Sequence, residues 1–289
     1  MFKTNLIKIF ILIFLFLINI FLFYSFYSLK TENQFEVVFL DVGQGNATLF
    51  KYKSGLNILI DSGKDLYGRK SLYKNLSFFD RNLDLTFATH YDFDHVGNFL
   101  NYFNKYNISY FFRNGKESKA PIYEELLKLT QEEAIKNIDL KAGDVIKIDE
   151  NSFIEILFPE EKINVNKLRD NDSSLILKLT YKNKTFLITG DASKKIESWM
   201  VEKYGKRLKS DFLLAGHHGS NTSSSEEFLR AVNPEYIIFS AGKNNSYNHP
   251  HPAVISLVEK LGIKYFRTDT VGTIKYIFNG EDWILKLEK

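Results

Sequence analysis

The sequence predicts an α/β protein in which helices cover two face-packed β-sheets, giving four layers, preceded by one transmembrane helix. Apolar strand-like runs alternate with amphipathic segments in both halves of the chain, which favours sheets with helices on their outer faces. No linker is long enough to divide the part after residue 30 into independent domains. We therefore expect a transmembrane signal anchor at residues 1–30 and a single domain at residues 31–289.

The N-terminal run from Ile9 to Ser28 contains no charged residue. Twenty residues of α-helix span about 30 Å, the thickness of the hydrocarbon core of a bilayer. The alternative, a buried core helix, would need to be enclosed on every side. No small-x-small cleavage site follows the run, which favours a retained anchor over a cleaved signal peptide. Lys3 and Lys8 precede it and favour a single-pass protein of the cell membrane with an extracytoplasmic domain.

The formal net charge of +3 comes entirely from Lys3, Lys8 and Lys30, the only charged side chains among the first thirty residues. The rest of the chain carries equal numbers of basic and acidic side chains, so net charge gives no support to nucleic-acid binding. The chain contains no cysteine, which excludes thiolate metal ligands and a cysteine nucleophile and fits an exported domain.

The first half of the domain contains short apolar runs separated by glycine-containing turns, the pattern of β-strands. The predicted strands are 35–42, 47–52, 56–61, 83–88, 108–113, 144–148 and 153–158. Helical spacing predicts helices at residues 69–76, 96–106 and 122–135.

The second half begins with a predicted hairpin, "SSLILKLTYKNKTFLITGDA", in which two apolar runs flank the turn "YKNK". Further strands are expected at residues 211–215, 236–240, 264–268, 273–278 and 283–287. The predicted helices are 193–204, 226–232 and 252–261.

All six histidines fall into three short clusters: His90 and His95, His217 and His218, and His249 and His251. Each cluster follows an apolar strand-like run, as does Asp191, so loops at one edge of the sheets could bring these side chains together. The alternative is a set of hydrogen-bonded structural histidines, but scattered core histidines would not cluster in this way.

The stretch "ATHYDFDHVGN", residues 88–98, interleaves two histidines with two aspartates. Imidazole and carboxylate ligands together suit zinc, iron or manganese. In a tight loop, His90, Asp92, Asp94 and His95 could face two ions about 4 Å apart, with Asp191 bridging them. Two ions that share a hydroxide provide a nucleophile at neutral pH, which suits phosphodiester hydrolysis.

The segment "HYDFDH" resembles the H-x-D-x-D-H variant of the metallo-β-lactamase fold motif in the hydrolase domain of the ComEC family of competence proteins. The resemblance extends over residues 36–280, because further segments follow in that group's order: "VVFLDVGQGNATLF", "ILIDSG", "NDSSLILKL", "FLITGDA", "LLAGHHGSNTSS", "SAGKNNSYNHPHP" and "RTDTVGTIKY". It implies a four-layer αββα metallo-β-lactamase fold sandwich and a metal-dependent hydrolase with two divalent ions, zinc or manganese.

The resemblance also implies roles for individual residues. His90 and Asp92 would hold one ion, Asp94 and His95 the second, and Asp191 would bridge them. The resemblance also makes Asp94 a catalytic residue.

His217 would be the next ligand, and His218 or His249 would act as the catalytic acid that protonates the leaving alkoxide. Which of these three histidines ligates and which acts as acid stays open.

Residues next to these positions have two interpretations each. Asp61 would either orient a metal-bound histidine or end its strand in a turn. Ser220, Asn221 and Thr222 would either donate hydrogen bonds to phosphate oxygens or cap the following helix.

The chain departs from the family pattern at several positions. It has no histidine from residue 96 to 216, where many metallo-β-lactamase fold enzymes have one, so Asp172, Asn171 or a serine of "NDSS" could substitute. Asp92 stands where lactamases and lactonases carry histidine, which argues against both activities. Asn46 stands where the ComEC-like group usually has an acidic residue, and Ser246 where it often has a basic one.

The function we expect is a membrane-anchored phosphodiesterase or nuclease that acts on DNA, or on another phosphodiester, outside the cytoplasm. One alternative is a hydrolase of a small ester or lactone in the cell envelope, since the fold hosts many chemistries. Another is a non-catalytic accessory module for DNA uptake that binds a competence-channel partner.

Overall fold

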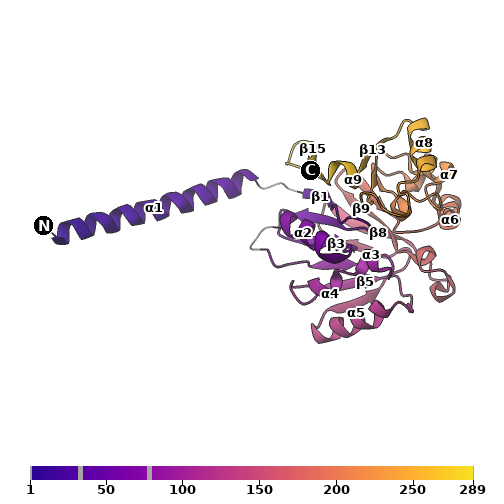
Figure 1. Cartoon of the computed structure of the whole chain (residues 1–289), viewed down its shortest axis with the longest axis horizontal. Helices are drawn as coiled ribbons and strands as arrows, with labels where there is room; N and C mark the ends of the chain where they lie inside the picture. The colour runs from indigo at the N-terminus through magenta and orange to yellow at the C-terminus, as the bar shows by residue number, and fades with distance from the viewer. Residues whose placement is uncertain (1, 32–34, 77–79, 289) are drawn as a thin grey trace.

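The computed structural model describes the backbone of residues 2–31, 35–76 and 80–288, and the side chains of residues 7–24, 35–76 and 80–288. Helix α1 (Phe2–Thr31) stands apart from the α/β domain (Figure 1). Residues 7–24 are long and apolar enough to span a membrane, and none of this stretch is buried against the rest of the protein. This helix is therefore a candidate membrane span.

Among the described residues, the first sheet has eight strands. Their order is β15 (Trp283–Glu288), β14 (Thr273–Phe278), β1 (Phe35–Phe39), β2 (Thr48–Tyr52), β3 (Asn57–Ile60), β4 (Leu85–Phe87), β5 (Tyr110–Arg113) and β6 (Lys136–Asp139). Neighbours from β15 to β3 pair antiparallel, and those from β3 to β6 pair parallel.

The second sheet has seven strands within the described part of the chain. Their order is β13 (Lys264–Arg267), β12 (Tyr236–Phe239), β11 (Phe212–Leu214), β10 (Lys184–Ile188), β9 (Ile176–Tyr181), β8 (Ser152–Phe158) and β7 (Val145–Lys147). Strands β10 to β13 are parallel, and the remaining neighbours are antiparallel.

The two sheets pack face to face through a core of aromatic and aliphatic side chains. Phe35 of β1 stacks on Tyr181 of β9 with the ring centroids 3.9 Å apart. The ring centroids of Phe39 of β1 and Phe212 of β11 are 6.4 Å apart. Both sheets contribute alternate residues to this cluster, as expected for strands with one face turned inward.

Helices cover the outer face of each sheet and complete the four layers (Figure 1). On the first sheet these are α2 (Asp65–Asn75), α3 (Phe93–Val96), α4 (Phe99–Tyr102) and α5 (Pro121–Glu132). On the second sheet they are α6 (Lys194–Tyr204), α7 (Glu226–Val232) and α8 (Pro252–Lys260). A short helix, α9 (Thr268–Val271), joins β13 to β14. The predicted α/β architecture of four layers is confirmed.

Three predicted helices differ most from the structure. The helix expected at 69–76 begins earlier, because α2 starts at Asp65, whose side chain accepts hydrogen bonds from Tyr67 N and Gly68 N. The helix expected at 96–106 is divided into α3 and α4, because the Asn98 backbone N–H donates to Gly63 O and Ser62 Oγ instead of continuing one helix. The helix expected at 122–135 ends at Glu132, and residues 136–139 form the edge strand β6. Strand β6 is mostly polar and exposed, so it lacks the apolar alternation that reveals buried strands.

Candidate metal centre

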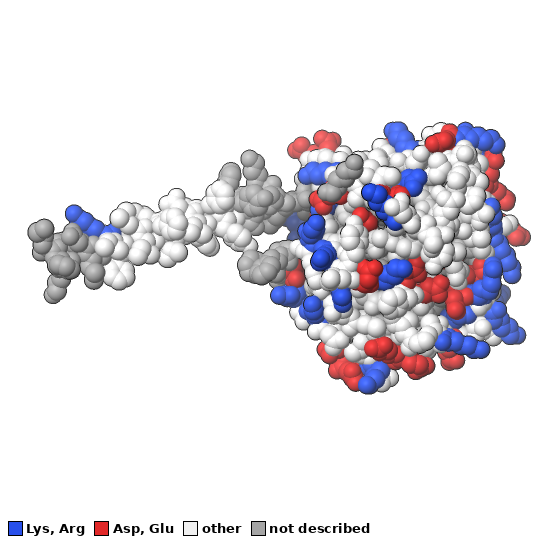
Figure 2. All heavy atoms as spheres, viewed as in Figure 1, with Lys and Arg blue, Asp and Glu red and all other residues white. Residues whose placement is uncertain are grey.

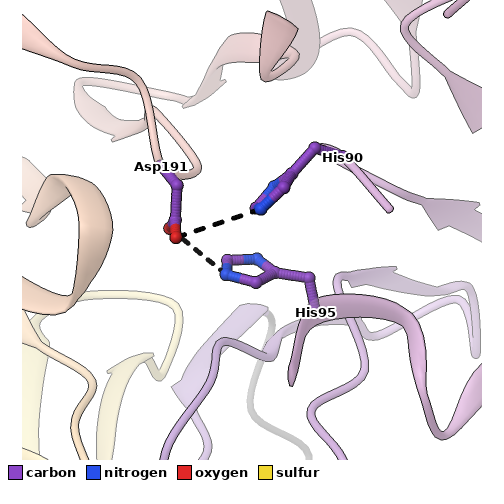
Figure 3. A group of neighbouring side chains, drawn as sticks. All are labelled: His90, His95 and Asp191. Carbon is purple, nitrogen blue, oxygen red and sulfur yellow. Dashed lines mark ion pairs between the residues drawn. The ribbon is translucent and has the colours of Figure 1, made fainter. Parts of the chain in front are cut away.

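Loops from both sheets converge at one edge of the domain. The loops after β3 and β4 carry Asp61 and His90, and the loops after β10 and β11 carry Asp191 and His218. Within each sheet these strands are parallel neighbours, so their carboxyl ends lie together, where α/β proteins place their sites. Figure 3 shows Asp191 pointing from its loop toward His90 and His95.

The first group of candidate ligands consists of His90, His95 and Asp191, all buried, with ligand atoms within 4.8 Å of one another. His95 Nε2 lies 3.2 Å from Asp191 Oδ1, and His90 Nε2 lies 3.9 Å from Asp191 Oδ2 (Figure 3). Asp92 is half-exposed beside this group, with its Oδ2 3.5 Å from His90 Nε2.

The second group consists of Asp94, His95 and His218, with the same 4.8 Å limit between ligand atoms. His218 Nε2 lies 3.4 Å from Asp94 Oδ2 and 3.6 Å from Asp191 Oδ2. Asp191 therefore contacts both groups from between them.

Four atoms in these groups test whether the residues fit a metal. The Nε2 atoms of His90, His95 and His218 and Oδ1 of Asp191 are buried and make no hydrogen bond to the described residues. A buried polar atom without a hydrogen-bond partner costs about 1–3 kcal/mol of folding free energy. Four such atoms that face one common space are explained together if a ligand binds there. Imidazole nitrogens and carboxylate oxygens are ligands of divalent transition metals, and this donor set fits such ions.

Each candidate ligand histidine also makes a hydrogen bond through Nδ1, the ring nitrogen that does not face the cluster. His95 Nδ1 donates to Asp61 Oδ2 at 2.7 Å, and His218 Nδ1 donates to Ser240 O at 3.0 Å. His90 Nδ1 donates to Thr89 Oγ1 at 3.1 Å, because that hydroxyl donates its own proton to Asp61 Oδ2. Each imidazole therefore directs the lone pair of Nε2 toward the shared space, as metal-ligating histidines do.

The charges within the cluster stabilise one another. Burial lowers the pKa of His95, but the Asp191 and Asp61 carboxylates outweigh burial and raise that pKa well above its ordinary value. Burial raises the pKa of Asp191, but the imidazoles of His95 and His218 hold it well below its ordinary value. The charges of His95 and Asp191 thus favour each other, and a bound metal ion would compete with protons for the same ligand atoms.

Asp61 ends its strand and also hydrogen-bonds to a histidine of the cluster. It follows β3 in the left-handed region with φ 56°, and its side chain is fully buried. Its carboxylate accepts hydrogen bonds from Thr89 N and Thr89 Oγ1, each at 2.9 Å, in addition to the bond from His95. Thr89 links two candidate ligands to Asp61, and no sequence pattern distinguished this threonine beforehand.

His217 and His218 occupy different positions although they are adjacent. Both have left-handed backbones, with φ 48° and 56°, so consecutive side chains turn to different sides. His218 is buried between Asp94 and Asp191, whereas His217 lies at the rim with 29% of its side chain exposed. His217 Nε2 is 3.6 Å from Asp191 Oδ2, and its Nδ1 is 3.1 Å from Thr222 Oγ1.

His249 lies on the same side of the cluster as His217. Its ring centroid is 5.5 Å from that of His217 and 6.2 Å from that of His218. Burial, together with the neighbouring His218 and His217, lowers the pKa of His249 to about 4. The imidazole is therefore neutral at pH 7.

The "NDSS" segment brings Asn171, not Asp172, next to the cluster. Asn171 Nδ2 lies 3.5 Å from Asp191 Oδ2. The Asp172 carboxylate accepts hydrogen bonds from Arg169 Nε at 2.9 Å and from Ser193 Oγ at 2.5 Å. Both oxygens of Asp172 are thus engaged within the supporting loops.

The turn before β2, which contains Gly43 and Gly45, packs directly on the loop of residues 88–98 that carries the candidate ligands. A Cβ added to Gly45, whose φ is +133°, would lie 2.1 Å from Asp94 O. The Asn46 N–H donates to that same carbonyl at 3.2 Å, so the turn fixes the backbone of Asp94. Gly45 therefore permits a close backbone approach as well as a tight turn.

The segment after His218 forms a small hydrogen-bonded turn. Ser220 Oγ is 3.0 Å from Thr222 Oγ1, and Asn221 is exposed. These residues do not cap the following helix, because the Ser225 side chain accepts from Phe228 N at the start of α7. Through Thr222, the turn supports His217.

Comparisons with known proteins identify the family of this chain. Residues 40–242 match the sequence model of the metallo-beta-lactamase superfamily. The chain is 32% identical over 274 residues to "ComE operon protein 3" of Bacillus subtilis, covering 89% of this chain and 34% of that protein. It is 35% identical over 246 residues to "Competence protein ComA" of Neisseria gonorrhoeae, covering 85% of this chain and 32% of that protein. The chain thus spans about a third of the length of these relatives.

Among solved structures, the metallo-beta-lactamase fold protein YhfI from Bacillus subtilis superposes with a TM-score of 0.56 at 13% identity, covering 81% of this chain and 96% of that one. This similarity supports the fold alone. The matched residues, 40–242, cover most of the α/β domain and contain the loop of residues 88–98, Asp191, His217 and His218. The chain belongs to the metallo-β-lactamase superfamily.

Proposed function

We propose that this protein is a metal-dependent phosphodiesterase that cleaves DNA, or another phosphodiester, outside the cytoplasm while α1 anchors it in the membrane. The observation that carries the proposal is the set of four buried ligand atoms, from His90, His95, His218 and Asp191, that face one another without hydrogen bonds. Such a donor set suits metal-assisted hydrolysis, in which charge on phosphoryl oxygens must be neutralised.

Two divalent ions, zinc or manganese, would be held by separate parts of the cluster. His90 and Asp92 would hold one, and Asp94, His95 and His218 the other, with Asp191 between them. Bound ions of this kind supply Lewis acidity and lower the pKa of a coordinated water. The assignment of His218 as a ligand follows from its burial and its distance to Asp94.

The chain's own residues would orient the ligands and handle protons. Asp61 and the Ser240 carbonyl hold the rings of His95 and His218, so that these ligands need no reorganisation when substrate binds. His249, at the rim beside His217 and neutral at pH 7, would donate an imidazole N–H hydrogen bond to the oxygen that leaves when the phosphodiester breaks. His217, held by Thr222, would contact the substrate from the same side.

DNA as substrate is supported by the relatives, one of which is named a competence protein. On the face of the described residues that Figure 2 shows, no large basic field is visible. Lys, Arg, Asp and Glu side chains are interspersed over the face of the domain in Figure 2, and α1 is uncharged along most of its length. Specificity for a polynucleotide would then depend on groups close to the cluster rather than on the net charge.

The test uses the chain of residues 1–289 in detergent, stripped of metal and reloaded with Mn²⁺ or Zn²⁺. It compares single- and double-stranded DNA with bis(p-nitrophenyl) phosphate. Asp191→Ala removes the residue between the two groups, and Asp282→Ala, in the exposed turn before β15, is the matched control. We expect metal-dependent DNA cleavage that Asp191→Ala abolishes and Asp282→Ala retains.

Turnover of the small ester without DNA cleavage would keep the hydrolase and exclude DNA as its substrate. Absence of any turnover with metal bound would contradict the proposal. That result would favour a non-catalytic DNA-uptake module with a competence-channel partner, which the presence of Asn171 beside Asp191 also favours, since an amide is a weaker ligand than imidazole.

A further inference from the structure

A second feature of the site is an apolar pocket on the Asp92 side of the cluster. Its volume is about 330 Å³, within the usual range of about 300–1,000 Å³ for small-molecule sites. Its walls include Phe93, Leu100, Pro121 and Ile122, so it lies between α3, α4 and the first turn of α5. Asp92 is part of the same wall.

Phe93 is the unusual residue of this pocket. It stands between the candidate ligands Asp92 and Asp94, at a position that the H-x-D-x-D-H pattern leaves free, and it is 56% exposed. Its ring lies over Gly97, where an added Cβ would be 3.2 Å from the ring atoms Cε2 and Cζ. The absence of a side chain at Gly97 thus lets an aromatic face rest at the edge of the site.

The chemistry of the pocket selects its ligand. Asp92 and Glu125 place carboxylates at its edge, which repel a phosphate group, while the remaining walls are aromatic or aliphatic. A flat, uncharged group with polar edges suits this combination, because it can stack on Phe93 and donate hydrogen bonds to the carboxylates. A nucleobase is such a group.

The position of the pocket ties its occupant to the reacting phosphate. Asp92 Oδ2 is 3.5 Å from His90 Nε2, so a group beside Asp92 belongs to a nucleotide next to the phosphodiester at the cluster. Bases in a duplex are stacked and paired, whereas bases of a single strand can turn outward onto an aromatic side chain.

We propose that Phe93 and this pocket bind an unstacked nucleobase adjacent to the cleaved phosphodiester, which makes single-stranded nucleic acid the preferred substrate class. The inference rests on the proposed phosphodiesterase function. Phe93 is a substrate-binding residue in this account and has no part in holding metal.

The experiment compares two single strands of equal length and charge: an oligo(dT) and an oligomer of abasic tetrahydrofuran nucleotides. The chain of residues 1–289, loaded with Mn²⁺, is assayed on each strand, and the ratio of the two kcat/KM values measures discrimination. We expect the wild type to favour oligo(dT) by about tenfold, since a base can stack on the aromatic side chain in this strand and none can in the abasic strand. Phe93→Ala should bring the ratio close to one, and Phe93→Trp should retain it.

Phe153→Ala is the matched control, because Phe153 is also exposed, at 39%, but lies on β8 away from the cluster. Measured Mn²⁺ content and thermal unfolding show whether Phe93→Ala has damaged the metal loop, and in that case Phe93→Leu replaces it, since leucine keeps apolar bulk without an aromatic face. An unchanged ratio in the folded Phe93 variant would overturn the inference while leaving the phosphodiesterase standing.

If the wild type cleaves neither strand, single-stranded DNA is not its substrate, the bis(p-nitrophenyl) phosphate assay still tests the phosphodiesterase, and fluorescence anisotropy of the same labelled strands decides the pocket separately. Weaker binding of oligo(dT), but not of the abasic strand, by the Phe93 variant would support a base pocket. Equal binding by wild type and variant would overturn it.

Discussion

Substitutions at Asp61 should distinguish its contribution to fold stability from its contribution to metal binding. Its fully buried carboxylate accepts from Thr89 N, Thr89 Oγ1 and His95 Nδ1 at 2.9, 2.9 and 2.7 Å. Asp61→Ala leaves two buried Thr89 donors unpaired, each at a cost of about 1–3 kcal/mol, so we expect a loss of about 2–6 kcal/mol in the free energy of unfolding. The left-handed φ of 56° adds to this loss, because alanine adopts it less readily than aspartate.

Asp61→Asn should behave differently. Asparagine tolerates the left-handed backbone, and its carbonyl can still accept from Thr89 N, so the stability loss should stay within about 1–2 kcal/mol. Its amide nitrogen is a donor, however, and cannot accept the proton of His95 Nδ1. His95 must then carry its proton on Nε2, which faces Asp191, and metal affinity should fall by about 10–100-fold.

The assay combines chemical denaturation of the metal-free protein with a Mn²⁺ titration of the same samples, for wild type and both variants. Wild-type Mn²⁺ affinity in Asp61→Asn would refute the role of Asp61 in orienting His95. Equal stability losses in the two variants would refute the hydrogen-bond assignment.

Three further predictions concern other parts of the chain. Gly45→Ala should destabilise the protein and weaken metal binding, because its Cβ would lie 2.1 Å from Asp94 O. The control Gly55→Ala is also at positive φ but has nothing within 4 Å of its Cβ, so it should cost only about 1 kcal/mol of stability. Equal behaviour of the two variants in thermal unfolding and metal titration would contradict this prediction. Asn171→His should raise metal affinity, since it places an imidazole beside Asp191, and an unchanged titration would show that residue 171 does not face the ions. Burial raises the pKa of Glu197, despite its bonds from Ser225 N and Ser224 N. Because its folded-state pKa exceeds the unfolded value of 4.5, stability should fall as pH rises from about 4.5 through the raised pKa, and Glu197→Gln should remove that slope from denaturation curves measured across this range.

The sheets and the clustering of candidate ligands in residues 88–98 could be predicted because their signals are local. Apolar runs reveal strands buried between layers, and His90, Asp92, Asp94 and His95 lie within one short segment. The edge strand β6 was missed because it is polar and exposed.

The choice between adjacent residues could not be made from sequence. His218, not His217, faces Asp94 because two successive left-handed backbones turn the side chains apart. Asn171, not Asp172, faces Asp191 because Arg169 and Ser193 hold the Asp172 carboxylate in the supporting loops. Both outcomes depend on tertiary contacts.

Supporting residues were the least visible of all. Thr89 hydrogen-bonds to Asp61 and His90 through one hydroxyl, and Ser240 holds His218 through its backbone carbonyl. A hydroxyl or a carbonyl carries no sequence signature for such a role, so only the three-dimensional arrangement identifies it.

The central claim is that the cluster around Asp191 holds divalent metal, and anomalous diffraction at the manganese edge tests it most directly. Crystals of the protein grown with Mn²⁺ should show anomalous density between Asp191, His95 and His218, and dialysis with elemental analysis should show that Asp191→Ala loses this metal. Failure of the protein to bind Mn²⁺ or Zn²⁺, or anomalous density only at sites away from these residues, would contradict this claim.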